Sequence, residues 1–539
     1  MKNLMAWRSE RGPQPPSALR RWAVRLGLAC LALEASYLVV GNLCLRLGLL
    51  EDLINRQPEA VFVSWESGHT FLPGFATLKG FVYRGQTMEG QTYVRLAEVN
   101  GRVSLMGFFS RTVDLRGVDA RDVDFRFRER IDYPCWAEDD GRPFPDPPAN
   151  LEFFPEIPGF ENPPNPRPED IYSSDDESKP WTFRISQAHL EGSVQFAHND
   201  LRINGVGSAT GGLTIVLGES NAIDRGVVRL GPAEVTWASR ELTDDLALEV
   251  DVNVKPFPAV CAELSDVMEG TSGTLTVAGT NSSGFAVNID ALTPLLPGQG
   301  ALSLESGIGA LEARLEKRER KSASGRLDLV ADDVILKREE IPLQGDLEVH
   351  ASLTEGNLAT GTFDVSGSTI RLDDIAQSGS SEKQQGKLEP WYGDLEIEEG
   401  ILTFGSPMTM NGHVRMAMED TRPVLIVLRK FTNEMKWLNL TRNVKQLDGT
   451  MDLGFGAGYL TVDNLDLAGE GVEILGWVHI RDQIKDGRLY ARHGARAVGF
   501  AFDRGEGRLV TKKPRRWFDE QQGSTPTGGS PGPGEDEPR

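Results

Sequence analysis

The sequence predicts a mainly β protein, in which an N-terminal transmembrane helix is followed by a long antiparallel meander with few short helices. Two observations lead to this prediction. Residues 22–50 form an apolar segment that exceeds the about 20 residues needed to cross a bilayer. Between residues 61 and 510, short runs with an apolar residue at every second position follow one another, which is the period of a strand with one buried face.

The apolar segment 22–50 decides which compartment holds the rest of the chain. Basic residues precede it or lie in its first turn, against the single acid Glu10: Lys2, Arg8, Arg11, Arg20, Arg21 and Arg25. Because positive residues stay on the cytoplasmic side, we expect a cytoplasmic N-terminus and an exported chain from about residue 51. A cleavable signal peptide needs a shorter apolar region and a small-x-small site, and no clean site is present. The segment is therefore predicted to be an uncleaved anchor.

The composition of the chain indicates which classes of molecule it is expected to bind. The chain has 539 residues and a net charge of −22, so its exported bulk repels phosphate backbones and nucleic acid is not an expected partner. Its length exceeds the about 250–300 residues of a single core, which predicts several domains or one elongated, repetitive body. Of the four cysteines, Cys30 and Cys44 lie in the anchor. Cys135 and Cys261 either form a bridge or remain separate thiols.

A single acid, Glu34, lies near the middle of the predicted span. A carboxylate is costly at that depth. Two interpretations are open: Glu34 pairs with a partner, or it is protonated or shifted toward the interface.

The strand pattern begins in residues 51–130, which we expect to form an N-terminal β module. Val123, Phe125 and Phe127 alternate there with charged residues, as in a half-buried strand. The pattern returns in residues 182–512 as a repetitive β-rich region. Gly-containing pairs between its strands predict hairpin turns: Gly345-Asp346, Gly356-Asn357 and Asn411-Gly412.

The two β regions are separated by residues 131–181, which are rich in proline and acids. Proline cannot donate a ladder hydrogen bond or continue a helix, so this stretch is predicted to be an exposed insert or linker. Helices are expected at 258–270, 433–447 and 515–522, and a disordered end after residue 522. The predicted organisation is a basic cytoplasmic tail, an anchor, a β module, an insert, a β-rich groove region, and a short helix with a disordered tail: 1–21, 22–50, 51–130, 131–181, 182–512 and 513–539.

The sequence offers little for catalysis. Its seven histidines are scattered, and it contains no HExxH, CxxC, G-x-S-x-G or Walker A pattern. We therefore expect no catalytic residues, no metal ligands and no cofactor, and do not expect an enzyme.

One-sided alternation over about 20 strands produces a broad apolar face that a few short helices cannot cover. Either the sheet folds onto itself, or an apolar guest occupies the face; in an exported, membrane-tethered protein that guest is expected to be lipid. Two sets of residues are predicted to contact lipid, the second on two adjoining strands: Leu246, Leu248, Val250 and Val252, and Met408, Met410, Met416 and Met418. Methionine suits mobile acyl chains, and equally fills gaps in an ordinary core.

Three stretches carry a resemblance to a known family. They are the Leu72-Pro73-Gly74 turn leading to RVSLMGFFSRTVDLRGVDARDVDFRFR at 102–128, GDLEIEEGILTFGSPMTMNGHVRM at 393–416, and 449–490. Together with the N-terminal anchor, these stretches resemble the AsmA-like family of envelope proteins, which includes TamB-type relatives. The resemblance implies an elongated, twisted, half-open β-groove that is anchored in the inner membrane and projects through the periplasm. It also implies phospholipid movement between membranes, a role in outer-membrane integrity, and no catalytic residues.

The functional hypothesis is thus a single-pass inner-membrane protein whose periplasmic bulk handles phospholipid or another acyl-chain ligand and contributes to outer-membrane biogenesis. Its expected partners are the membrane, lipid and other envelope proteins. The alternative is a structural or assembly adaptor of a secretion or outer-membrane assembly system, with a closed β core.

Overall fold

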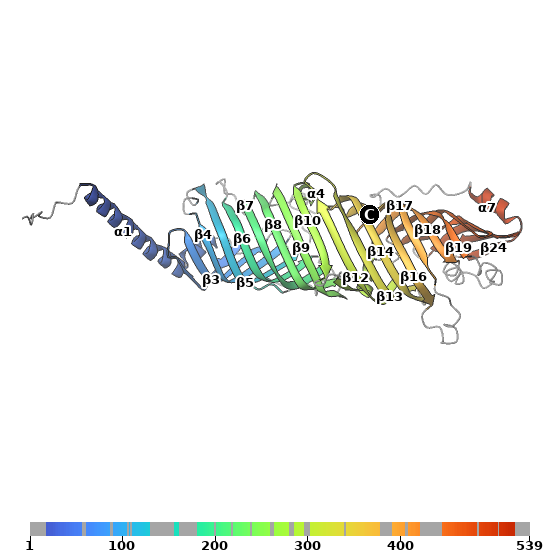
Figure 1. The fold of residues 1–539 in the computed structure, drawn as a ribbon, viewed down its shortest axis with the longest axis horizontal. Helices are drawn as coiled ribbons and strands as arrows, with labels where there is room; N and C mark the ends of the chain where they lie inside the picture. The colour runs from blue at the N-terminus through green and yellow to red at the C-terminus, as the bar shows by residue number, and fades with distance from the viewer. Residues whose placement is uncertain are drawn as a thin grey trace, which may run out of the picture.

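The computed structural model places α1 at one end of an elongated, twisted sheet whose strands follow in chain order to α7 at the other end (Figure 1). This confirms the mainly β prediction. The described residues are 18–55, 61–86, 90–104, 107, 110–129, 156–160, 181–198, 201–216, 219–237, 240–258, 264–279, 285–295, 302–338, 341–377, 391–404, 408–420, 445–456, 458–481, 484–504 and 506–522.

The N-terminal helix α1 spans Ala18–Arg46, and its Arg25–Arg46 portion is long and apolar enough to cross a membrane. Its large side chains are exposed, as in Leu33 at 76%. The short helix α2 (Leu49–Ile54) follows, with Glu51 and Asp52 in its first turn, where carboxylates interact favourably with the helix dipole. Glu34 is half-buried, and its Oε1 atom has no hydrogen-bond partner among the described residues.

The strands form one 24-stranded sheet. Their bounds are β1 Val61–Ser64, β2 Ser67–His69, β3 Phe75–Gln86, β4 Gly90–Val103, β5 Thr112–Glu129, β6 Thr182–His198, β7 Leu201–Val216, β8 Ser220–Trp237, β9 Arg240–Pro258, β10 Thr271–Gly279, β11 Phe285–Asn288, β12 Leu302–Lys317, β13 Ala323–Arg338, β14 Ile341–Asn357, β15 Thr362–Asp364, β16 Ser368–Gln377, β17 Gly393–Thr403, β18 Thr409–Asp420, β19 Lys445–Gly456, β20 Tyr459–Gly469, β21 Val472–Arg481, β22 Ile484–His493, β23 Arg496–Asp503 and β24 Glu506–Val510. Most strands pair with the next strand along the chain, whereas β1 and β2 both pair with β3, and β11 and β15 are short pieces beside β12 and β17.

One pairing, β5 with β6, is parallel, whereas the other described pairings are antiparallel. Parallel neighbours need a crossover of a dozen or more residues, and the Pro-rich stretch occupies that position in the chain. Of this stretch, Glu156–Phe160 is described: Ile157 is 2% exposed, and the Arg84 Nη1 donates to the Gly159 carbonyl oxygen at 3.2 Å. The sheet therefore continues without a break past residues 131–181.

The strands are longer than the sequence predicted, because irregularities that the sequence marks as turns lie inside strands. Gly345-Asp346 falls at a register shift within β14, and Asn411-Gly412 lies within β18, opposite Ile401 and Gly400. These two turn predictions were wrong; Gly356-Asn357 does end β14. Many long strands instead contain a residue with positive φ at or beside a register shift: Asp122, Gln187, Arg225, Asp333, Asp374 and Asn464. Such bulges bend and twist a strand, which curves the sheet.

Few helices accompany the sheet. The predicted helix at 258–270 is shorter, because Pro258 ends β9 and α4 spans Leu264–Glu269. Of the helix predicted at 433–447, residues 433–444 lie outside the described part of the chain. Lys445–Leu447 belong to β19, so the prediction was wrong for these last three residues. The helix at 515–522 is confirmed as α7 (Pro514–Gln522). Cys135 and Cys261 and the predicted disordered tail also lie outside the described residues.

Candidate functional site: an apolar track along the sheet

The strand register brings apolar residues from distant parts of the chain into one line. The line starts at Phe81, and each of its residues lies directly opposite the next one on the neighbouring strand, as far as Leu327 of β13. The partner of Leu327 on β14 is Ala351. From β14 onward the line is displaced by two residues and starts again at Val349. We call this line the apolar track: Phe81, Leu96, Val123, Gly192, Gly207, Leu230, Leu248, Val277, Ala313 and Leu327, then Val349, Ile370, Leu395, Met416, Gly449, Leu467, Ile474, Ala491 and Val498.

The track crosses the sheet from β3 to β23. At the usual ~4.8 Å between neighbouring strands, a path of this kind is on the order of 90 Å long. Because side chains alternate between faces, the residues beside the track on each strand point to the opposite face. A single face thus carries apolar side chains along nearly the whole body.

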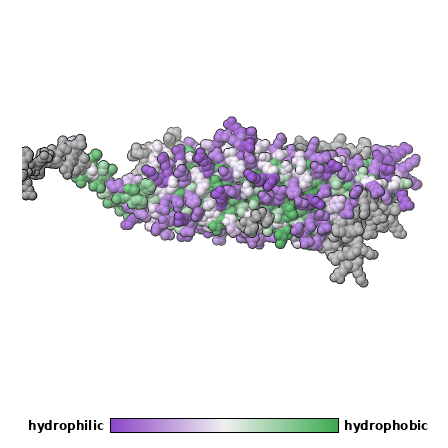
Figure 2. Space-filling model, viewed as in Figure 1, coloured by the Kyte–Doolittle hydropathy of each residue, from purple (hydrophilic) through white to green (hydrophobic). Residues whose placement is uncertain are grey.

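The opposite face carries ion pairs between neighbouring strands. Arg229 pairs with Glu249 at 2.8 Å, Arg415 with Asp448 at 3.3 Å, and Arg492 with Glu473 at 2.9 Å. Hydrophilic side chains cover much of the visible surface, with hydrophobic side chains exposed in its lower middle part (Figure 2). The described piece of the Pro-rich stretch also lies on the charged face, since it contacts Arg84 and Arg126. The described contacts of the crossover are thus with the charged face, while on the track face Leu96 and Val123 are each 7% exposed and pack with Ala120.

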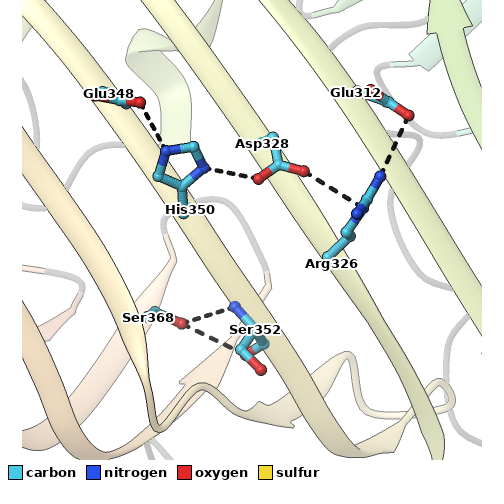
Figure 3. Close-up of polar contacts among 7 residues, drawn as sticks. All are labelled: Glu312, Arg326, Asp328, Glu348, His350, Ser352 and Ser368. Carbon is cyan, nitrogen blue, oxygen red and sulfur yellow. Dashed lines mark hydrogen bonds and ion pairs between the residues drawn. The ribbon is translucent and has the colours of Figure 1, made fainter.

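A network on this charged face joins β12, β13 and β14 (Figure 3). The His350 Nδ1 lies 2.8 Å from Asp328, and its Nε2 lies 2.7 Å from Glu348. Hydrogen bonds with Asp328 and then Glu348 raise the pKa of His350 above its ordinary value. Arg326 extends the network to Glu312 at 3.7 Å. These groups fasten neighbouring strands together, and their ring and carboxyl atoms are exposed to solvent.

The first predicted set lies on the track face of β9. Leu248 belongs to the track, and Leu246, Val250 and Val252 lie on the same face of the strand. Leu246 is 5% exposed, whereas Leu248, Val250 and Val252 are half-buried. Leu248 packs against the buried cluster that contains Leu246 and Val287, whereas Val250 and Val252 belong to none of the hydrophobic clusters of the described residues. The structure thus brings these residues together on a partly open surface.

The methionines differ from the prediction in one respect. Met410, Met416 and Met418 lie on a single strand, β18, and not on two adjoining strands, while Met408 immediately precedes it. Their even spacing places the three on one face. Met416 is half-buried, but Met410 and Met418 are 5% and 4% exposed and pack in hydrophobic clusters.

The track face is covered at several places by the chain itself. Met410 packs with Phe363 and Val365, which the short strand β15 and its turn supply. Trp391 packs with Met418, Leu447 and Leu467. The 3-10 helix η4 (Ile289–Leu295) places Ile289, fully buried, against Leu304 and Leu329. Leu230, Ala233 and Val235 of β8 and Leu246 of β9 are also buried, in a cluster with Val287 that Leu292 of η4 packs against. The face is therefore packed locally from β8 to β13 and in the last third of the sheet, and more open at Val228, Val250 and Val252.

The sequence predicts a strand at Phe363 and Val365 but not that they cover the track face, and it does not single out Trp391. Phe363, Val365 and Trp391 lie in or beside short pieces without a long alternating pattern, and their burial depends on contacts with strands far away in the chain. One buried hydroxyl on this face, that of Ser368, accepts from the Ser352 backbone N–H at 3.0 Å (Figure 3). No feature of a single sequence indicates such long-range partners.

Comparison of the chain with family models, curated proteins and solved structures finds no match.

Proposed function

We propose that the protein is a single-pass membrane protein that holds acyl chains of phospholipid along its apolar track. The observation that carries this proposal is the continuity of one apolar face from β3 to β23, half-buried at Leu248, Val250 and Val252. Each CH₂ group transferred from water to such a surface contributes about 0.8 kcal/mol. A chain of lipid carbons lying along the face removes both its own and the protein's apolar surface from water.

The length and anchoring of the body suit transfer between membranes. α1 joins one end of the sheet and supplies an apolar helix of membrane-spanning length. We place it in the inner membrane, with the basic N-terminus in the cytoplasm and the sheet in the periplasm, in keeping with the charge distribution and the resemblance to AsmA-like envelope proteins. In this arrangement the protein receives phospholipid near the inner membrane and contributes to outer-membrane biogenesis.

The test uses two neighbouring positions on β9. A photo-crosslinking amino acid is placed at Val250, on the track face, or at Asp251, on the charged face, and the full chain is irradiated in cells. We expect phospholipid adducts at position 250 and none above background at 251. Equal labelling at both positions, or no lipid at position 250, contradicts the proposal.

The packed clusters around Met410, Val414 and Met418 favour a second candidate, an assembly adaptor with a closed β core. In that case the half-buried residues of β9 face a protein partner. The same crosslinker at position 250 then yields a protein adduct in place of a lipid adduct.

A further inference from the structure

The loop before β3 is fastened to the side of α1. The Thr70 backbone N–H donates to Asn42 Oδ1 at 3.0 Å, and Asn42 Nδ2 donates to the Thr70 carbonyl oxygen at 2.9 Å. The Tyr37 hydroxyl lies 3.1 Å from Thr70 Oγ1 and accepts from the Gly74 backbone N–H at 3.1 Å. These contacts position the loop beside α1 and level with Tyr37.

Tyr37 lies nine residues before Arg46, the end of the candidate span. At 1.5 Å per residue this separation is about 13 Å along the helix. Closer to Arg46, the Trp65 indole N–H donates to the Leu45 carbonyl oxygen at 2.9 Å, and tryptophan is typical of the membrane–water boundary. If Arg46 and Trp65 mark that boundary, the loop beside Tyr37 lies inside the hydrocarbon region.

The exposed side chains of the loop fit this depth. Phe71 is 58% exposed, Leu72 47% and Phe75 37%, and residues 70–75 contain no charged side chain. The hydrophobic surface of α1 continues onto the adjoining end of the sheet (Figure 2). Arg102 lies opposite Phe75 on β4, with its guanidinium 5.3 Å from the centre of the Phe75 ring.

Backbone polar groups in lipid must find partners within the protein. In this loop the Thr70 N–H and carbonyl bond to Asn42, and the Gly74 N–H bonds to Tyr37. The Leu72 carbonyl oxygen accepts from Thr70 Oγ1 at 3.0 Å and from the Phe75 N–H at 3.0 Å, and the Gly74 carbonyl oxygen accepts from the Val103 N–H at 2.6 Å. The loop thus combines exposed apolar side chains with a backbone whose named groups are satisfied internally.

We infer that residues 70–75 form a second membrane contact, a loop inserted into the bilayer leaflet nearest the sheet, beside the last turns of α1. The inference rests on the proposed membrane span of α1. It places the start of β3, the strand on which the apolar track begins, at the lipid surface.

The test measures the depth of a label in the full-length protein. Its four cysteines are replaced by alanine, the protein is reconstituted in nanodiscs of phosphatidylethanolamine and phosphatidylglycerol, and an environment-sensitive fluorophore is attached at Leu72→Cys. Doxyl-labelled phospholipids quench fluorophores within the bilayer. The matched controls are Val39→Cys, on the exposed side of α1, and Ile484→Cys, an exposed apolar position on β22.

We expect quenching at position 72 to approach that at position 39 and to exceed that at position 484 several-fold. Quenching at 72 no greater than at 484, with strong quenching at 39, overturns the inference and leaves the proposed function standing. Weak quenching at all three positions means that α1 does not span the bilayer, and both the inference and the proposed membrane anchoring fail.

Discussion

At the residue scale, the track face contains both open and tightly packed positions. Val250 is half-buried beside the open part of the track, whereas Leu467 is 1% exposed and packs with Trp391 and Leu447. A charge in an open path displaces lipid, while a charge in a closed cluster is a buried, unpaired ion. The two sites therefore predict opposite phenotypes for the same substitution.

We expect Leu467→Asp to destabilise the protein by about 3–5 kcal/mol, the usual effect of an uncompensated buried charge. Val250→Asp should leave the melting temperature nearly unchanged and reduce bound lipid. Thermal unfolding and lipid extraction of both variants provide the measurement. Unfolding of Val250→Asp to the same degree as Leu467→Asp identifies Val250 as ordinary core.

The His350 network predicts a pH dependence of stability. Hydrogen bonds with Asp328 and Glu348 raise the pKa of His350 in the folded protein above the about 6.5 of an unperturbed histidine. The stabilisation is therefore complete below pH about 6.5 and is lost as the pH rises through the raised pKa. The side chain is 48% exposed, so solvent screening limits the effect to less than ~1 kcal/mol.

We expect His350→Gln to lose this stabilisation at pH 6 but not at pH 9, in urea titrations of the full chain at both pH values. Asp328→Asn, which removes the first partner, should reduce the same difference. An NMR titration in which His350 changes charge at or below pH 6.5 contradicts the prediction.

At the element scale, the parallel β5–β6 pair is the least ordinary feature of the sheet. Gly192 of β6 faces Val123 of β5, and a Cβ atom added to Gly192 would overlap the Val123 carbonyl oxygen. We expect Gly192→Val to destabilise the protein by about 1–3 kcal/mol through overpacking. The control is Gly27→Ala in α1, where an added Cβ atom meets nothing within 4 Å. Gly471→Ala also meets nothing within 4 Å, but it is not a neutral control because the φ of Gly471 is +72°.

The crossover before β6 has a minimum length. Thr112 lies opposite Thr182 and Arg128 opposite Ala197, so the chain must return along the whole of β5, a distance of about 55 Å at ~3.3 Å per residue. A fully extended chain needs roughly 16 residues for this. Replacing residues 131–155 and 161–180 with a flexible linker of about 30 residues in total should retain the sheet, whereas a six-residue linker should abolish the β5–β6 pairing. Circular dichroism and hydrogen exchange of β6 measure the outcome, and a native-like sheet with the short linker contradicts the parallel register.

How far the sequence predicts this architecture depends on the range of the interactions. Alternation within Leu246–Val254 was sufficient to predict a strand and its apolar face, because strand periodicity is local. The parallel pairing of β5 with β6, the bulge at Asp122 and the burial of Phe363 follow from contacts between distant segments. The same residue types mark turns and bulges, which is why Gly345 was assigned to a turn and lies inside β14.

At the scale of the whole molecule, the proposed function fixes the topology. With α1 spanning the inner membrane and a basic N-terminus in the cytoplasm, as we propose, β24 and α7 would lie outside the cytoplasm. A reporter that is active only after export, fused after Val510, should be active, and the same reporter placed before Ala18 should be inactive. A cytoplasmic C-terminus contradicts both the anchoring and the lipid hypothesis.

The length of the track limits the distance over which one chain could carry lipid. Under the proposed function, a path on the order of 90 Å that is covered locally by η4, Phe363 and Trp391 would exchange lipid with partner proteins. Shortening it should therefore impair transfer more than binding. Removal of α7 does not shorten the track, because α7 packs through Phe518 on Tyr490, on the face opposite the track residue Ala491; lipid bound near β9 should therefore be unchanged in that variant.

The most direct measurement is the amount and identity of lipid bound to the purified full-length protein, by native mass spectrometry after transfer into a detergent that removes loosely associated lipid. The account predicts phospholipid in at least equimolar amount in the unmodified protein and a large loss in folded Val250→Asp. A lipid-free, folded protein, or lipid retained in full by Val250→Asp, would contradict the claim that the apolar track is a lipid-binding surface.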